Sequence, residues 1–210
     1  MNLLPVLERV EANSYLCCPP FILRIILEAS QLAASDPSCT RPETARRALA
    51  LVRDARSFNI PAWARSVQPH VSHPDLAARE HVASAHRSAV LLYILRAVPS
   101  VREYAPVSAG ELLDDILRRL SEVGEGDPLF KATSWPTFIA GAETTDPQWR
   151  AWALRRLLEV WGCCPWGYVV TAVEMLRETW RGRDGGDGEE VEGRGWLREV
   201  WDMDFGCLIV

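Results

Sequence analysis

The stretch HPDLAAREHVASAHRSAVLLYILRAV, residues 73–98, is the longest helical candidate in the chain. Its proline at position 74 suits the first turn of a helix, and it stops before Pro99, which cannot continue one. Its most apolar run, VLLYIL at 90–95, is far too short to span a bilayer. We therefore predict one long helix here, within a soluble and almost entirely α-helical domain.

Further helices are predicted before this stretch. The segment PPFILRIILEASQLA (19–33) opens with prolines that suit a first helical turn, and its Arg24 and Glu28 lie four residues apart on the expected polar face. In PETARRALALVRDARSF (42–58) the apolar residues recur at helical spacing. The segment IPAWARSV (60–67) is expected to form a short helix or a turn.

Prolines and polar residues also divide the rest of the chain into helices. In SAGELLDDILRRLSEV (108–123), Ser108 and Glu111 have the spacing of a capping box, in which each side chain satisfies a free backbone N–H of the other. Pro136 interrupts residues 128–143, so a broken or kinked helix is expected there.

Two amphipathic helices are predicted next. In DPQWRAWALRRLLEVWG (146–162), Asp146 is the expected N-cap and Pro147 occupies the first helical position, while Pro165 is expected to start the following helix. The expected apolar face of the first comprises Trp149, Trp152, Ala153, Leu157, Val160 and Trp161, and that of the second comprises Trp166, Val169, Val170, Val173, Leu176 and Trp180.

The end of the chain differs in composition from the predicted helices before it. Residues 182–195 are Gly-rich and charged and lack apolar periodicity, so they are expected to form a flexible loop. A last short helix is expected over 196–204, with the apolar tail 205–210 tucked against the bundle. Because strand alternation and βαβ spacing are absent, the sequence predicts a single all-α domain over 1–210, an irregular bundle of about 7–9 helices packed largely as antiparallel pairs.

Charge and cysteine usage limit the classes of function. The chain of 210 residues has a net charge of -5, which argues against binding DNA or RNA by itself, because phosphates require a basic patch. The six cysteines form two adjacent pairs and two singletons, which predicts reduced, mostly buried thiols in a cytosolic or nuclear protein. They are Cys17, Cys18, Cys39, Cys163, Cys164 and Cys207. Residues 1–10 lack the features of a signal peptide, and the nine tryptophans are expected to serve mainly packing.

The sequence holds no recognisable catalytic or metal centre. His81 and His86 are five apart, which misses the spacing of two ligands on one helix face, and His70 and His73 lie beside prolines, as in a loop. The glycine stretch 182–188 lacks the phosphate-binding and calcium-binding patterns. We therefore predict no catalytic residue, no metal ligand and no cofactor. A site assembled in space from Cys163 or Cys164 and a histidine stays open as an alternative.

One stretch carries a recognisable order of residues. WPTFIAGAETTDPQWRAWALRRL (135–157) contains Trp135-Pro136, Phe138-Ile139, Ala140-Gly141-Ala142-Glu143, Asp146-Pro147 and Arg150. This order resembles the fungal-specific transcription factor domain, the helical regulatory region that follows the six-cysteine zinc cluster of fungal transcription factors, and in particular its acriflavine sensitivity control group. The segments 15–33, 84–98, 175–190 and 195–210 are similar to other parts of that domain, so the resemblance covers roughly residues 13–210.

The resemblance implies a transcription-regulatory domain in the nucleus, or otherwise the cytoplasm. Its implied partners are proteins of the transcription machinery or a second copy of the chain, with an unidentified small-molecule effector. The six-cysteine zinc cluster is absent, so direct DNA binding is not implied, and no membrane association is expected. We expect Met1 to lie inside the family domain, in a truncated product, a fragment or a free-standing module. The alternatives are a helical scaffold unrelated to transcription and the Cys/His enzyme.

Overall fold

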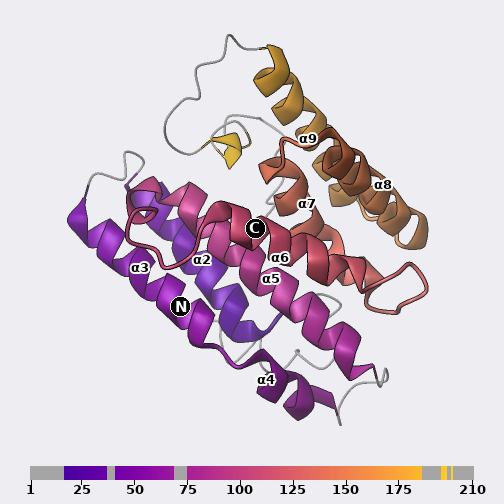
Figure 1. Ribbon diagram of the computed structural model, residues 1–210, viewed down its shortest axis with the longest axis horizontal. Coiled ribbons are helices and arrows are strands. Elements are labelled where there is room, and N and C mark those ends of the chain that lie inside the picture. Colours follow the sequence, from indigo (N-terminus) through magenta and orange to yellow (C-terminus); the bar gives the residue numbers. More distant parts are fainter. Residues whose placement is uncertain (1–16, 37–40, 69–74, 186–194, 198–199, 201–210) are drawn as a thin grey trace.

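The computed structural model describes residues 17–36, 41–68, 75–185, 195–197 and 200, and the regular structure within them is entirely helical (Figure 1). The described α-helices are α2 (Pro20–Ser35), α3 (Pro42–Ser57), α4 (Ile60–Val67), α5 (Leu76–Ala97), α6 (Ala109–Ser121), α7 (Ser134–Glu143), α8 (Pro147–Cys163) and α9 (Gly167–Gly185), with short 3₁₀ helices η3 (Pro99–Val101) and η4 (Phe130–Thr133). The predicted all-α bundle is therefore confirmed.

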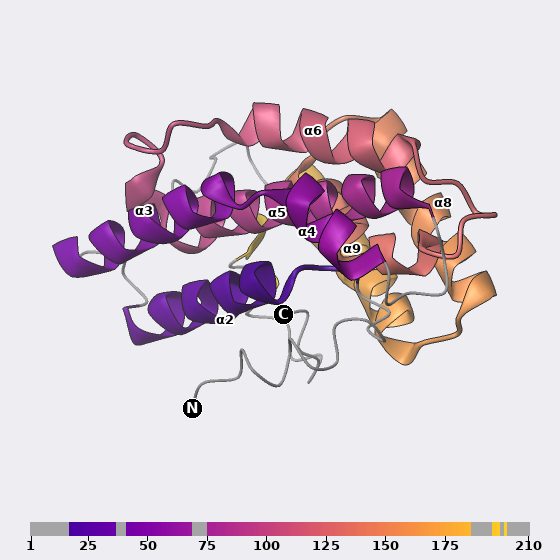
Figure 2. The ribbon, with the colours of Figure 1, turned by 90° about the horizontal axis from the view of Figure 1, so that it is seen from below.

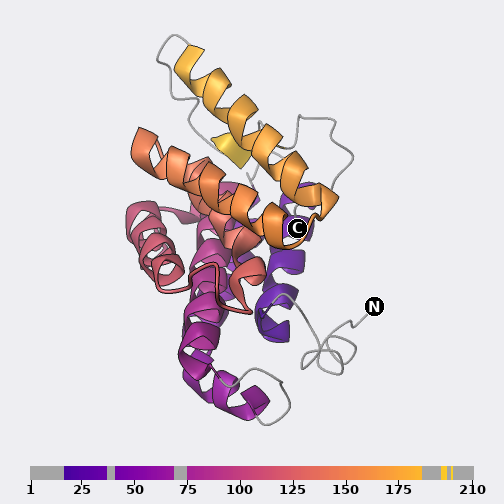
Figure 3. The ribbon, with the colours of Figure 1, turned by 90° about the vertical axis from the view of Figure 1, so that its right-hand side faces the viewer.

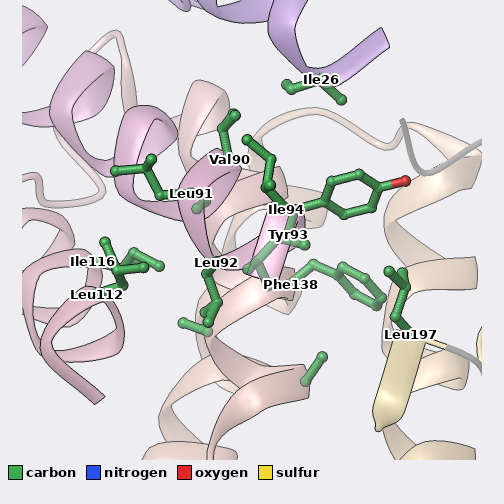
Figure 4. Close-up of a cluster of buried hydrophobic side chains, with 14 of the residues drawn as sticks. Ile26, Val90, Leu91, Leu92, Tyr93, Ile94, Leu112, Ile116, Phe138 and Leu197 are labelled. Carbon is green, nitrogen blue, oxygen red and sulfur yellow. The ribbon is translucent and has the colours of Figure 1, made fainter. Parts of the chain in front are cut away.

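Helix α5 is the centre of the fold, and it is the long helix predicted from residues 73–98. It packs against α2, α3, α4, α6 and α7, and Figure 2 shows it between α6 and α2. Nearly every residue from Val82 to Ala97 is buried, which a helix covered on all sides requires. Leu92 and Ile94 of α5 meet Ile116 of α6 and Phe138 of α7 in one continuous core (Figure 4).

The predicted starts of α6 and α8 are confirmed by their capping hydrogen bonds. The N–H of Glu111 donates to Ser108 Oγ, and the Glu111 carboxylate accepts from the N–H of Ser108, which completes the capping box of α6. Hydrogen bonds from the Ser108 backbone and hydroxyl lower the pKa of Glu111. At α8, Asp146 Oδ1 accepts from the N–H of Gln148, with Pro147 in the first turn.

The break expected near Pro136 lies before the proline. The 3₁₀ helix η4 ends at Thr133, and α7 begins at Ser134, so Pro136 occupies the first turn of α7. The first N–H groups of a helix have no partner within the helix, so the missing N–H of proline costs no hydrogen bond there. Pro136 thus marks a helix start without bending the helix that follows.

Helices α8 and α9 lie side by side at one end of the molecule (Figure 3). Two details of their prediction are wrong. Helix α9 begins at Gly167, two residues after Pro165, and Val170 and Trp149 are 40% and 37% exposed although the periodicity places them on apolar faces. Both helices pack against α7 and against each other, and the buried part of each stripe faces these contacts.

The flexible loop expected over 182–195 is wrong for its first residues, because α9 continues to Gly185. The Arg183 guanidinium donates to the carbonyl of Ala142, and Asp184 pairs with Arg150 at 2.7 Å, so contacts with α7 and α8 hold this last turn against the low helix propensity of its glycines. Residues 186–194 lie outside the described residues. So do most of the predicted helix 196–204 and the tail 205–210, although Trp196, Leu197 and Val200 are helical and buried.

Candidate functional site

The residues Ala140-Gly141-Ala142-Glu143 end helix α7, and they contact helices α5, α8 and α9. Gly141 faces both α8 and α9. A Cβ added at Gly141 would lie 2.9 Å from Ala153 Cβ, closer than real Cβ atoms approach their neighbours, and 3.0 Å from Leu176 Cδ1, which is tighter than most real contacts. The small-Gly-small pattern therefore lets three helices meet at one point, which we call the α7 junction and define as residues 140–143.

Side chains from α9 satisfy the last carbonyl groups of α7. Trp180 Nε1 donates to the carbonyl oxygen of Gly141 at 2.9 Å, and the Arg183 guanidinium donates to that of Ala142. No backbone N–H of α7 donates to these two carbonyls, because the helix ends at Glu143. Two side chains far along the chain thus cap α7 and fix the position of α9 against it.

Glu143 completes the junction with a carboxylate that is 7% exposed. It forms a two-pronged ion pair with Arg96 of α5, in which Arg96 Nε donates to Glu143 Oε2 at 2.9 Å. Trp196 Nε1 donates to the same Oε2 at 2.8 Å, and the Trp196 ring meets Phe138 edge to face. The acidic residue of the motif thereby joins α5, α7 and the segment around Trp196.

The same stretch also ties the start of α8 to the end of α9. The Arg150 guanidinium binds both oxygens of Asp184, at 2.7 and 3.0 Å, and lies over the ring of Trp180 at 5.4 Å. Arg150 Nε also contacts the carbonyl of Thr144 at 3.4 Å. The residues that carry the sequence pattern at 140–150 are therefore used for packing and hydrogen bonding between helices.

A second polar group inside the bundle was missed by the sequence analysis. Arg156 of α8 is 6% exposed, and its Nη2 donates to the carbonyl of Val123 at 2.6 Å while its Nε donates to Thr133 Oγ1 at 3.3 Å. Its guanidinium lies over the Phe130 ring at 4.5 Å. Burial lowers the pKa of Arg156 to about 10, opposed by the charge of Glu159, so the group remains protonated at pH 7.

Arg156→Met is expected to lower the free energy of unfolding by about 2 kcal/mol, because it leaves the buried Val123 carbonyl without its charged donor. The neighbouring Arg155 provides a matched control, since its side chain is 66% exposed and Arg155→Met should cost less than about 0.5 kcal/mol. Urea denaturation of both variants measures the difference. Equal effects at the two positions would contradict the buried role of Arg156.

The Cys/His alternative receives no support from the described residues. His86 is buried, stacks on Trp135 and contacts the carbonyl of Ala132 at 3.0 Å through Nε2. Neither Cys163 nor Cys164 forms a hydrogen bond with His81 or His86, and His70 and His73 lie outside the described residues. In this part of the chain, no three His, Cys, Asp or Glu side chains gather in a way that could hold a metal ion.

The prediction of mostly buried cysteines is correct for Cys17 and Cys18 and wrong for the second pair. Cys163 is exposed and Cys164 is half-buried, because α8 ends there and leaves the pair at its open end. Cys39 and Cys207 lie outside the described residues. The two described pairs therefore differ in access to solvent although their sequences are identical.

Iodoacetamide is expected to alkylate Cys163 well before Cys17. Cys163 is exposed, whereas Cys17 is buried, and burial raises the pKa of Cys17 to about 12, so little reactive thiolate forms at that site. Peptide mass spectrometry after timed alkylation at pH 8 measures both rates. Modification of Cys17 at the rate of Cys163 in the folded protein would show that the first pair is not enclosed as described.

The surface of α8 and α9 carries several large apolar side chains that the bundle does not cover. Leu158 is 51% exposed, and Trp149, Tyr168 and Val170 are each exposed by more than a third. Tyr168 also stacks on Trp166 and shares a hydrogen bond with Ser134 at 3.0 Å. Apolar side chains that are exposed singly are common on protein surfaces, so these residues do not by themselves define a contact surface.

The fold and the α7 junction define the class of protein: an all-α domain whose buried polar groups serve the packing of helices. The chain belongs to the fungal specific transcription factor domain family, whose family model matches residues 4–208. It is 42% identical to the acriflavine sensitivity control protein acr-2 of Neurospora crassa over 217 aligned residues. That alignment covers 98% of this chain and 36% of the relative. No solved structure matches the chain.

Proposed function

We propose that this chain is a transcription-regulatory domain that acts through contacts with proteins or a small effector, without binding DNA itself. Family membership supports a role in transcription regulation, and we propose that the chain is not an enzyme. The observation that supports the mode of action is the α7 junction. Its residues carry the family-like pattern, and their polar groups form hydrogen bonds and ion pairs between helices within the fold.

The charge of the chain supports the second part of this proposal. Binding of duplex DNA requires basic groups that neutralise phosphates, whereas the net charge here is -5. Several arginines are already engaged within the fold, including Arg96, Arg150 and Arg156.

The expected location of this activity is the nucleus, as the family implies. Among the described residues, no helix combines the length and the apolar character needed to cross a membrane. The partners that we propose are proteins of the transcription machinery or a second copy of the chain. The relative acr-2 is by name an acriflavine sensitivity control protein, and we propose that this chain takes part in a comparable response.

Fluorescence anisotropy tests the DNA part of the proposal. The purified chain is titrated into a pool of labelled random duplexes at physiological salt, and no saturable rise in anisotropy is expected. The same titration at low salt serves as a control, since weak electrostatic association would appear there and disappear as salt is added. A saturable rise in anisotropy that survives physiological salt would contradict the proposed mode of action.

A further inference from the structure

The neighbouring cysteines Cys163 and Cys164 are reactive side chains that the proposed function does not use. Helix α8 ends at Cys163, which is exposed, and Cys164 is half-buried. The chain contains the same dipeptide at Cys17 and Cys18, where the side chains are only 4% and 3% exposed. Two adjacent thiols that solvent reaches can react together with one small molecule, whereas the buried pair is closed to it.

Hydrogen bonds fix the backbone on both sides of the exposed pair. The N–H of Cys164 donates to the carbonyl of Val160 at 2.8 Å, and the N–H of Trp166 donates to the carbonyl of Cys164 at 2.7 Å. Cys164 has an extended backbone, with φ -145° and ψ 101°, as expected for a residue that precedes a proline. The two thiols therefore belong to one short segment of set shape, which lowers the entropic cost of binding a ligand to both.

The separation of the two residues disfavours a direct disulfide between them. Their peptide bond is trans, so their Cα atoms lie about 3.8 Å apart. The Cα atoms of ordinary disulfides are about 4.4–6.8 Å apart, and other separations strain the bond. An atom placed between the two sulfurs lengthens the bridge and relieves this constraint. The pair therefore suits one bridging atom better than it suits direct oxidation.

The number of sulfur donors limits which bridging atom the pair suits. Structural zinc sites use about four protein ligands, and within the described ranges no three His, Cys, Asp or Glu side chains gather in a way that could hold a metal ion. Trivalent arsenic that carries one organic group needs two further ligands, and soft acceptors of this kind prefer sulfur. Two adjacent thiols supply both of these ligands.

The neighbours of the pair favour an aromatic group on the ligand. Trp166, two residues after Cys164, stacks on Tyr168 with the ring centroids 5.7 Å apart. Burial and, to a smaller extent, Cys164 raise the pKa of Tyr168, opposed by its hydrogen bond with Ser134, so Tyr168 lies within electrostatic reach of the thiol. An aryl group attached to arsenic would therefore find aromatic side chains beside the sulfurs.

We propose that Cys163 and Cys164 form a binding site for trivalent arsenicals that carry one organic group. In the binding step an arsenoxide condenses with the two thiols. Two As–S bonds form, the As–O bond and both S–H bonds break, and the oxygen leaves with the two protons as water. Arsenic and sulfur keep their oxidation states, so no oxidant is required. The inference deepens the effector part of the proposed function, and it rests on that function only for its consequence in regulation.

Titration of the reduced full chain with phenylarsine oxide tests the proposal. Intact-mass spectrometry should show one phenylarsenic group per chain at equimolar probe, and the number of accessible thiols should fall by two. Cys163→Ser and Cys164→Ser should each weaken binding at least about a hundredfold, because the second As–S bond forms within one molecule only when both thiols are present. Circular dichroism of each variant checks that the helical fold is retained.

The buried pair provides the matched control. A chain with Cys17→Ser and Cys18→Ser should bind the probe as the wild-type chain does, and so should the Cys39→Ser and Cys207→Ser variants. Alkylation of the wild-type complex with iodoacetamide gives the same answer without a variant, since the thiols of the exposed pair should be the ones protected.

Three results would overturn the proposal: no adduct at equimolar probe, wild-type affinity in the Cys163→Ser or Cys164→Ser variant, or protection of a different pair of thiols. Stoichiometric binding of zinc that blocks both thiols of the exposed pair would replace the arsenical by a metal. None of these results bears on DNA binding, so a failure of this site and a failure of the proposed function are distinguishable.

Discussion

Gly141→Leu is expected to lower the free energy of unfolding by about 3 kcal/mol, near the upper end of the usual cost of overpacking a core. The reason is the absence of space where α7 meets α8 and α9. The first carbon of the new side chain would lie 2.9 Å from Ala153 Cβ, which can give way only by a shift of the backbone, and 3.0 Å from Leu176 Cδ1, so the Leu176 side chain would have to move as well. Urea denaturation followed by tryptophan fluorescence measures the loss.

Gly182→Ala is the matched control for this prediction. Gly182 also lies in a helix, but a Cβ added there meets no atom within 4 Å. Alanine loses less conformational entropy on folding than glycine does, so this variant should be more stable than the wild-type chain by about 0.5–1 kcal/mol. If the Gly141→Leu variant had wild-type stability, the three helices could not meet as closely as described.

Glu143→Ala is expected to cost about 3 kcal/mol and to loosen the segment around Trp196. The change leaves Arg96, whose side chain is only 23% exposed, without its counter-charge, and it removes the acceptor of the Trp196 indole N–H. Breaking a buried ion pair by removing one partner is costly because the other charge stays buried. Denaturation measures the loss of stability, and exchange of the Trp196 indole proton followed by NMR measures the loosening.

Glu178→Ala is the control for the ion pair. Glu178 pairs with Arg181 on the surface of α9, where both side chains are well exposed, so its removal should change stability by less than about 0.5 kcal/mol and leave Trp196 exchange unchanged. The loss of stability in Glu143→Gln should lie between the losses in Glu143→Ala and Glu178→Ala, since the amide oxygen of glutamine can still accept from Trp196. Equal losses in the Glu143→Ala and Glu178→Ala variants would mean that the α7 junction contributes no more than a surface pair.

Local signals in the sequence were sufficient for much of the fold. The start of α6 at Ser108 and that of α8 at Asp146 follow from side chains that cap their own helix, so the information lies within three residues. The central position of α5 is reflected in its continuous apolar run. The end of α9 could not be predicted in this way, because its glycine-rich last turn is held by Arg150 and by the carbonyl of Ala142.

The contacts of the α7 junction depend on residues far apart in the sequence. Glu143 contacts Arg96, 47 residues earlier, and Trp196, 53 residues later, and no local sequence pattern predicts either partner. Arg155 and Arg156 are adjacent and chemically identical, yet only the second is buried. The sequence identified residues 140–143 through a family resemblance, whereas the reason for the pattern is visible only in three dimensions.

A reporter assay tests the central claim most directly. The chain is fused to a heterologous DNA-binding domain, and transcription of a reporter is measured in a fungal host for the wild-type chain, Gly141→Leu and Gly182→Ala. The wild-type and Gly182→Ala fusions should change reporter transcription relative to the DNA-binding domain alone, and the Gly141→Leu fusion should not. A wild-type fusion that reaches the nucleus in folded form and leaves transcription unchanged would contradict a transcription-regulatory role and favour a scaffold outside transcription.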